Sequence, residues 1–182
     1  MTGPGAVDAG PVVAGLVAAG LTVATAESLT GGLLCATLVD VPGASAVVRG
    51  GIVAYATELK ADVLGVDADA LARTGPVDGT VAEQMARGAR RVLGADVGLA
   101  TTGVAGPGPA DGFPAGTVFV GIAADALPGG ARHVRLDVPG DRPQVRRGTV
   151  QAVLAHLAAL LQAQAQAEGG GGVAEQDAVP GS

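Results

Sequence analysis

Apolar and polar positions follow two rhythms along the chain, and these rhythms predict its helices and strands. Apolar residues that recur every three or four positions indicate helices over residues 7–19, 30–40, 57–65, 67–73, 80–94 and 142–162. Runs of apolar and β-branched residues indicate strands over 21–26, 51–56, 96–103, 115–124 and 131–138. The predicted order of elements is therefore αβαβααβββα.

Glycine, proline and hydroxyl residues mark several ends of these elements. The second helix should end before Pro42-Gly43, because proline and glycine do not continue a helix. Thr80 and Glu83 form a capping-box pattern at the start of the helix over 80–94, and Gly94 is a natural end. A turn at 128–130 should join the last two strands.

The order of elements predicts the fold class. The early strands alternate with helices, which favours parallel pairing, whereas the last three strands follow one another directly, so at least one must be antiparallel. We expect an α/β fold, a three-layer α/β/α sandwich around a mixed, mostly parallel five-stranded sheet. One domain should cover residues 1–162, and the low-complexity segment 163–182 should be a disordered tail.

The composition of the chain indicates which kinds of partner it could bind and in which cellular compartment it could function. Acidic residues outnumber basic ones by 17 to 11, which disfavours nonspecific binding to nucleic acid. The chain has no apolar run of ~20 residues, so we expect no membrane span, and its start lacks a basic signal-peptide region. The single Cys35 cannot form an internal disulfide, which fits the cytoplasm, and its apolar surroundings predict a buried thiol.

The segment "ESLTGG", residues 27–32, is the first candidate for chemistry. A strand that turns through glycines into a helix directs free backbone N–H groups toward one point, which can bind a phosphate or an oxyanion. Ser28 lies at this bend. Alternatively, Ser28 or Thr30 is a simple helix cap, and Glu27 makes only a local hydrogen bond to the backbone.

The second candidate is Lys60, which is the only lysine among 11 basic residues. A desolvated lysine can lose its proton, whereas arginine effectively cannot, so a specific role would explain why lysine is retained here. Tyr55 is also unique and lies at the end of the strand before Lys60. Chance retention of Lys60 on a helix surface and ordinary packing of Tyr55 are the alternatives.

The third candidate is the glycine- and proline-rich loop after Thr102, which can bring its backbone close to a ligand or simply connect two strands. Arg142 and Arg146 lie four apart at the start of the last helix, so they share a face and could clamp a phosphate or remain solvated. His133 and His156 have no further ligand at metal-binding spacing, so no metal site is predicted.

Six motifs occur in one order: "AESLTGGLL", "VPGASAVVRGGIVAYATELKADVLGV", "VAEQMARGAR", "ADVGLATTGVAGP", "GTVFVGIA" and "GDRPQVR". Together they resemble the CinA C-terminal domain family, the nicotinamide-nucleotide amidohydrolases, over about residues 10–162. The resemblance implies hydrolysis of the carboxamide of nicotinamide mononucleotide to nicotinic acid mononucleotide and ammonia, in pyridine-nucleotide salvage. It also implies a stand-alone form of the domain and a homodimer, and we expect no cofactor.

The resemblance also implies roles for individual residues. Ser28 matches the family's proposed nucleophile, and Lys60 and Tyr55 match the residues expected to remove its proton. The matched substrate-binding positions are Glu27, Thr30, Gly31, Gly32, Thr102, Gly103, Gly106, Arg142 and Arg146. The amides of Thr30 to Gly32 are expected to stabilise the oxyanion, and Arg142 or Arg146 to hold the 5′-phosphate.

The sequence departs from the family pattern at three places, Asp78, Ala56-Thr57 and Pro109, which affects the expected substrate contacts more than the expected chemistry. Two other functions fit the same residues. One is a noncatalytic nucleotide-binding module. The other is an interaction protein of DNA uptake or damage response, as the family's competence-related name suggests.

Overall fold

The computed structural model describes residues 7–170 and contains one five-stranded sheet. The strands lie in the order β2-β1-β3-β4-β5. Strands β1, β2 and β3 pair in parallel, and β4 is antiparallel to both of its neighbours. Their bounds are β1 Val23–Glu27, β2 Val48–Val53, β3 Val97–Gly103, β4 Thr117–Ala123 and β5 Ala131–Asp137. The mixed sheet predicted from the order of elements is confirmed.

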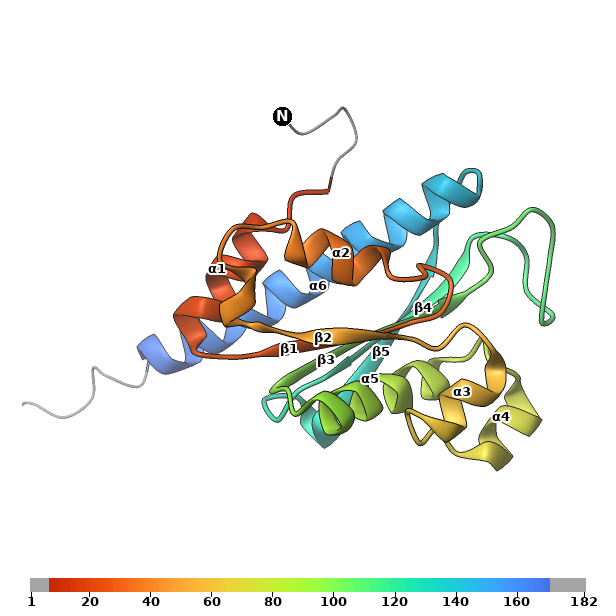
Figure 1. Cartoon of the computed structure of the whole chain (residues 1–182), viewed down its shortest axis with the longest axis horizontal. Coiled ribbons are helices and arrows are strands. Elements are labelled where there is room, and N and C mark those ends of the chain that lie inside the picture. Colours follow the sequence, from red (N-terminus) through yellow and green to blue (C-terminus); the bar gives the residue numbers. More distant parts are fainter. Residues whose placement is uncertain (1–6, 171–182) are drawn as a thin grey trace, which may run out of the picture.

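Helices cover both faces of this sheet, so the chain forms the three-layer α/β/α sandwich expected from its sequence (Figure 1). On one face lie α1 Gly10–Ala19, α2 Leu33–Val39 and α6 Arg142–Gly170. On the other lie α3 Thr57–Asp62, α4 Ala68–Thr74 and α5 Gly79–Leu93. Two 3₁₀ turns, η1 Ala44–Ala46 and η2 Pro128–Gly130, complete the connections. None of the helices within residues 7–170 is both long and apolar enough to cross a membrane.

The two faces of the sheet are packed in different ways. Large aliphatic side chains such as Leu16, Leu99 and Leu157 fill the layer beneath α1 and α6. On the other face, α5 lies so close that a Cβ added to Gly98 would be 2.0 Å from the carbonyl oxygen of Ala86. The abundance of glycine and alanine therefore reflects close backbone approach as well as turns.

The connections place a crevice at one edge of the sheet. From β1 the chain reaches β2 through α2 on one face, and from β2 it crosses to β3 through α3, α4 and α5 on the other. Strands β1 and β3 are neighbours, and the chain leaves β1 toward β2 but leaves β3 in the opposite direction along the sheet, toward β4. Ligands of open α/β sheets bind at such a topological switch point.

Several boundaries differ from the sequence prediction. Strand β2 covers Val48–Val53 rather than 51–56, because its ladder with β1 begins at Val48. Helix α5 begins at Gly79, and Asp78 caps it by accepting the amides of Thr80 and Val81, so the Thr80–Glu83 capping box is wrong. Asp78 therefore supplies the capping function that serine would also provide.

Helix α6 continues past the predicted end at residue 162 to Gly170. Alanine and glutamine, which form helices well, fill the continuation, and the first glycine pair comes only at 169–170. The predicted disordered tail is therefore corrected over 163–170, and residues 171–182 lie outside the described part of the chain.

Candidate active site

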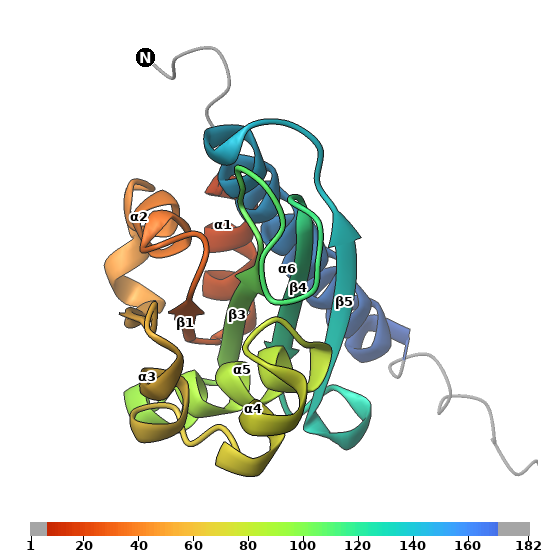
Figure 2. The same ribbon diagram turned by 90° about the vertical axis from the view of Figure 1, so that its right-hand side faces the viewer.

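A pocket of about 270 Å³ lies at the carboxyl edge of the sheet, where the three candidate segments converge. Figure 2 looks onto this edge and shows the loop after β3 beside the elements that follow β1 and β2. The volume is close to the lower end of the range for small-molecule sites. The pocket is lined by Ser28, Leu29, Tyr55, Thr57, Lys60, Pro76, Val77, Arg142 and residues 102–111.

Ser28 follows the last residue of β1 directly. Its backbone N–H donates to the carbonyl oxygen of Thr101 at 2.9 Å, so the bend is fixed to the neighbouring strand β3. The side chain is half-buried and lines the pocket. A hydroxyl at this bend is held by backbone hydrogen bonds and faces the space that a ligand would occupy.

Lys60 lies on α3 with only 1% of its surface exposed. Its Nζ atom lies 3.1 Å from Ser28 Oγ and donates to the carbonyl oxygen of Ala54 at 2.8 Å. Burial lowers the pKa of Lys60, while the carboxylates of Asp111 and Glu58 act in the opposite direction. A neutral amine at this position can accept the proton of the serine hydroxyl, so the pair has the geometry of nucleophile and base.

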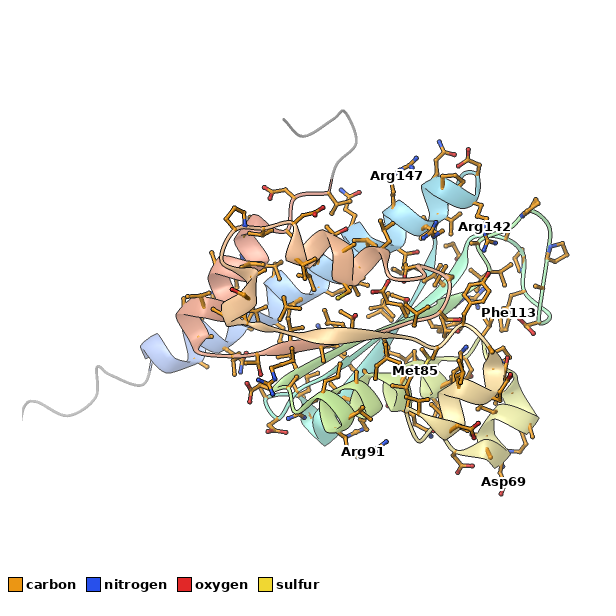
Figure 3. All side chains as sticks on the ribbon, in the orientation of Figure 1. Asp69, Met85, Arg91, Phe113, Arg142 and Arg147 are labelled. Carbon is orange, nitrogen blue, oxygen red and sulfur yellow. The ribbon has the colours of Figure 1, made fainter. Side chains whose placement is uncertain are left out.

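Tyr55 also lines the pocket but has a different partner. Its hydroxyl accepts a hydrogen bond from Arg142 Nη2 at 2.7 Å, and its side chain is largely exposed. Arg142 Nη1 donates to the carbonyl oxygen of Gly106 at 2.9 Å, which links the start of α6 to the loop after β3. Figure 3 labels Arg142 on this side of the molecule. The Tyr55 hydroxyl therefore contacts Arg142, whereas Lys60 contacts Ser28 directly.

Glu27 does not line the pocket, although the family pattern matches it to a substrate position. Its carboxylate is fully buried and accepts the backbone N–H groups of Gly32, Leu34 and Cys35 at 2.8–3.0 Å. This is the local hydrogen bonding that the sequence left open as an alternative. Glu27 therefore supplies the negative charge at the start of α2 and shapes the bend that carries Ser28.

The amides expected to stabilise an oxyanion are mostly engaged within the protein. Gly31 N–H donates to the carbonyl oxygen of Ser28, and Gly32 N–H donates to Glu27. Within residues 7–170, no hydrogen-bond acceptor is found for the amides of Leu29 and Thr30. Leu29 lines the pocket, so its amide is a candidate oxyanion donor that sequence reasoning missed.

Thr30 and Arg146 lie behind the bend rather than in the pocket. The Arg146 guanidinium donates twice to the carbonyl oxygen of Thr30, at 3.2 Å from Nε and 2.6 Å from Nη2. The Thr30 hydroxyl pairs with that of Thr101 at 2.7 Å. Arg142 and Arg146 therefore do not form the shared clamp expected from their spacing, since Arg142 alone lines the pocket.

Thr102, Gly103 and Gly106 all line the pocket. The Thr102 hydroxyl donates to the carbonyl oxygen of Pro76 at 2.6 Å, which ties the end of β3 to the loop before α5. Gly103 has a φ of 153°, and an added Cβ would lie 2.4 Å from the carbonyl oxygen of Thr117. Sequence reasoning missed Pro76, Val77 and Asp111, of which only Asp111 carried a signal, the turn-forming Asp-Gly pair.

Comparison with known proteins decides the family. The model of the CinA C-terminal domain matches residues 9–161. The chain belongs to the CinA C-terminal domain family. A CinA-like protein from Frankia casuarinae is 56% identical over 135 residues, which make up 73% of this chain and 30% of that protein. A relative from Desulforamulus reducens, named as a competence-damage inducible protein, is 47% identical over 133 residues, 73% of this chain and 32% of its own.

Solved structures of CinA proteins share the fold. A CinA superfamily protein from Klebsiella pneumoniae superimposes with a TM-score of 0.81 at 34% identity, covering 85% of this chain and 96% of that one. A competence/damage inducible protein from Agrobacterium tumefaciens gives a TM-score of 0.78 at 36% identity, covering 84% and 92%. The chain spans about a third of the length of the curated relatives it matches.

Proposed function

We propose that this CinA C-terminal domain hydrolyses the carboxamide of nicotinamide mononucleotide to nicotinic acid mononucleotide and ammonia. The observation that carries the proposal is the 3.1 Å contact between Lys60 Nζ and Ser28 Oγ inside the pocket. The family resemblance supplies the substrate. A serine beside a buried amine is one of the arrangements that activate a hydroxyl nucleophile.

The first half of the reaction forms an ester on Ser28. Neutral Lys60 accepts the hydroxyl proton while Ser28 Oγ forms a bond to the carboxamide carbon. The tetrahedral oxyanion is stabilised by the backbone N–H of Leu29, and the loss of one such donor typically costs ~10²–10³ in rate. Protonated Lys60 then returns the proton to the departing nitrogen, so that the carbon–nitrogen bond breaks and ammonia leaves.

Water completes the second half. Lys60, neutral again, accepts a proton from a water molecule whose oxygen attacks the ester carbon. The ester bond breaks, Ser28 recovers its proton through Lys60, and the pyridine carboxylic acid is released. The same base thus serves both steps, and no cofactor is required for the balance of atoms.

The remaining pocket residues would bind the nucleotide. Arg142 lies at the rim with its guanidinium fixed between Tyr55 and Gly106, so it is the arginine that we assign to the 5′-phosphate. Thr102 and the backbone of residues 103–108 would shape the ribose and ring subsites. We include in the proposal a homodimer, which the resemblance implies, and a cytoplasmic location, which the single cysteine favours. The exposed Val53 on edge strand β2 and Leu59 on α3 are apolar surfaces that such contact would cover.

The test is to incubate the purified protein with nicotinamide mononucleotide and to measure ammonia together with the acid product. We expect stoichiometric release of both, and loss of both in Ser28→Ala, whose substrate binding should persist. Thermal stabilisation by the nucleotide without ammonia release would instead support the noncatalytic binding module. Unchanged ammonia release by Ser28→Ala would remove Ser28 from the mechanism.

A further inference from the structure

Asp111 lies at the rim of the pocket, in the loop between β3 and β4. Among the pocket-lining residues within the described chain, it carries the one carboxylate, and Lys60 and Arg142 carry the two basic groups. The reaction proposed above gives Asp111 no role. It lines the same pocket as Ser28 and Lys60, so it is within reach of a bound ligand, which suggests a contribution to the choice of substrate.

The backbone holds Asp111 in a defined turn. Ala110 and Phe113 exchange two backbone hydrogen bonds of 3.0 and 2.9 Å, and the residues between them, Asp111 and Gly112, have φ values of 50° and 79°. These are the features of a type I′ turn, for which Asp-Gly and Asn-Gly are favoured sequences. Asparagine can therefore replace Asp111 without disturbing the turn.

An aromatic contact anchors this turn to the body of the domain. The ring of Phe113 packs edge-to-face on Phe119 of β4, with 6.0 Å between the ring centroids and an interplanar angle of 78°. The Arg135 guanidinium lies 5.9 Å from the centroid of the Phe113 ring. Figure 3 labels Phe113 at this edge of the molecule, on the same side as Arg142. The Asp111 carboxylate is thus carried on a supported hairpin beside the pocket.

The charged side chains that line the pocket indicate what charges a bound ligand should carry. The proposed mechanism requires Lys60 to be neutral before it acts, which leaves one anion and one cation at the rim, Asp111 and Arg142. A ligand that complements both carries a positive group and a negative group. Nicotinamide mononucleotide has this distribution, because its pyridinium ring is cationic and its phosphate is anionic.

We propose that Asp111 makes the pocket selective for a cationic aromatic ring, so that N-ribosyl pyridinium amides are preferred over analogues with a neutral ring. The inference rests on the proposed function for the identity of the ring. It extends that function by assigning substrate selectivity to a residue that takes no part in bond making. One exposed charge pair contributes modestly, so the preference should be roughly twofold to fivefold.

The experiment compares two ligands that differ in ring charge. Ser28→Ala protein, which cannot turn over substrate, is titrated calorimetrically with nicotinamide mononucleotide and with its 1,4-dihydro form, whose ring is neutral. The titrations are repeated in Ser28→Ala proteins that also carry Asp111→Asn or Asp137→Asn. Asp137→Asn removes the same charge from a largely exposed side chain that does not line the pocket.

We expect the protein with Asp111 intact to prefer the cationic ring and Asp111→Asn to lose that preference through weaker binding of the pyridinium form. Affinity for the dihydro form should stay within about twofold, and Asp137→Asn should keep the full preference. An equal preference with and without Asp111, or none in the parent, would overturn the inference, as would failure of both ligands to bind. Absence of ammonia release by the wild type beside an intact preference would overturn only the proposed hydrolysis.

Discussion

Lys60 Nζ lies 3.1 Å from Ser28 Oγ, although the two residues are 32 positions apart in the chain. The contact exists because α3 and the end of β1 meet at the carboxyl edge of the sheet. A second hydrogen bond from Lys60 to the carbonyl oxygen of Ala54 fixes the direction of the amine. Two consequences of this arrangement can be measured separately, one on catalysis and one on stability.

The catalytic consequence is tested with Lys60→Arg and Lys60→Met. Arginine keeps the charge but cannot act as a base near neutral pH, and methionine keeps the approximate volume without any proton affinity. We expect ammonia release from nicotinamide mononucleotide to fall at least ~10²-fold in both variants, as for the loss of a general base. Circular dichroism checks that each variant is folded. Turnover within a few-fold of the wild type in a folded variant would remove Lys60 from the mechanism.

The stability consequence depends on pH. Burial lowers the pKa of Lys60 below its ordinary value of 10.5, so the unfolded chain binds more protons than the folded one between the lowered pKa and 10.5. Unfolding therefore takes up a proton in this window, and the stability contributed by Lys60 rises with pH across it. Below the window both states are protonated and the buried charge is fully unfavourable. The free energy of unfolding of Lys60→Met, measured relative to that of the wild type, should accordingly be highest at low pH. This difference should shrink as the pH approaches 10.5.

Urea unfolding of both proteins at a series of pH values from 6 to 10 measures this difference directly. The two proteins share every other titratable group. The contributions of those groups to the pH dependence therefore cancel to first order in the difference between the two free energies of unfolding. A stability difference that is constant over the whole range would show that burial does not perturb the Lys60 amine.

The sequence predicted the edge of the sheet at which chemistry would concentrate, because that prediction needed only the order of the strands and the segments that follow them. Ser28 follows β1 directly, Lys60 lies in the helix after β2, and Thr102 lies near the end of β3. Parallel strands end at the same edge of a sheet. The convergence of these side chains is a consequence of topology, and it could be predicted without knowledge of any distance.

The partners of individual side chains could not be predicted in this way. Arg142 and Arg146 share a helix face, yet one reaches Tyr55 and the other the Thr30 carbonyl, because the bend after β1 approaches α6 only at the second arginine. The sequence matched Glu27 to a substrate-binding position, but its carboxylate accepts hydrogen bonds from backbone amides at the start of α2 instead. Such choices depend on tertiary packing and on which groups are left without partners.

Arg142 lines the pocket, whereas Arg146 contacts the Thr30 carbonyl behind it, and this difference gives two linked predictions. Arg142→Gln should raise KM for nicotinamide mononucleotide roughly tenfold, because a charged contact to phosphate is lost, and leave KM for the riboside that lacks phosphate nearly unchanged. Steady-state kinetics on the two substrates provides the measurement. Equal effects on both substrates would show that Arg142 does not bind the phosphate.

Arg146→Gln should act on stability instead. The carbonyl oxygen of the buried Thr30 would lose its charged donor and keep the N–H of Leu33, which should cost about 1–2 kcal/mol. We expect a lower urea midpoint with little change in the ratio of KM between nucleotide and riboside. A selective rise in KM for the nucleotide, with stability unchanged, would instead support phosphate binding by Arg146.

The close approach of α5 to its surroundings gives a last prediction, which compares two glycines inside helices. A Cβ at Gly88 of α5 would lie 2.2 Å from the carbonyl oxygen of Leu64, a backbone atom that cannot move aside without displacing the chain. At Gly15 of α1 the nearest atom would be Leu161 Cδ1 at 3.1 Å, the end of a flexible side chain. Alanine is favoured over glycine in both helix interiors by about 1 kcal/mol, so helix propensity is matched between the sites.

Gly88→Ala should therefore destabilise the domain by about 2 kcal/mol or more, as overpacking against a rigid neighbour does, whereas Gly15→Ala should be neutral or stabilising. Thermal and urea unfolding of the two variants measure the difference. Equal stability of the two variants would mean that α5 packs less closely on the preceding loop than the structure indicates.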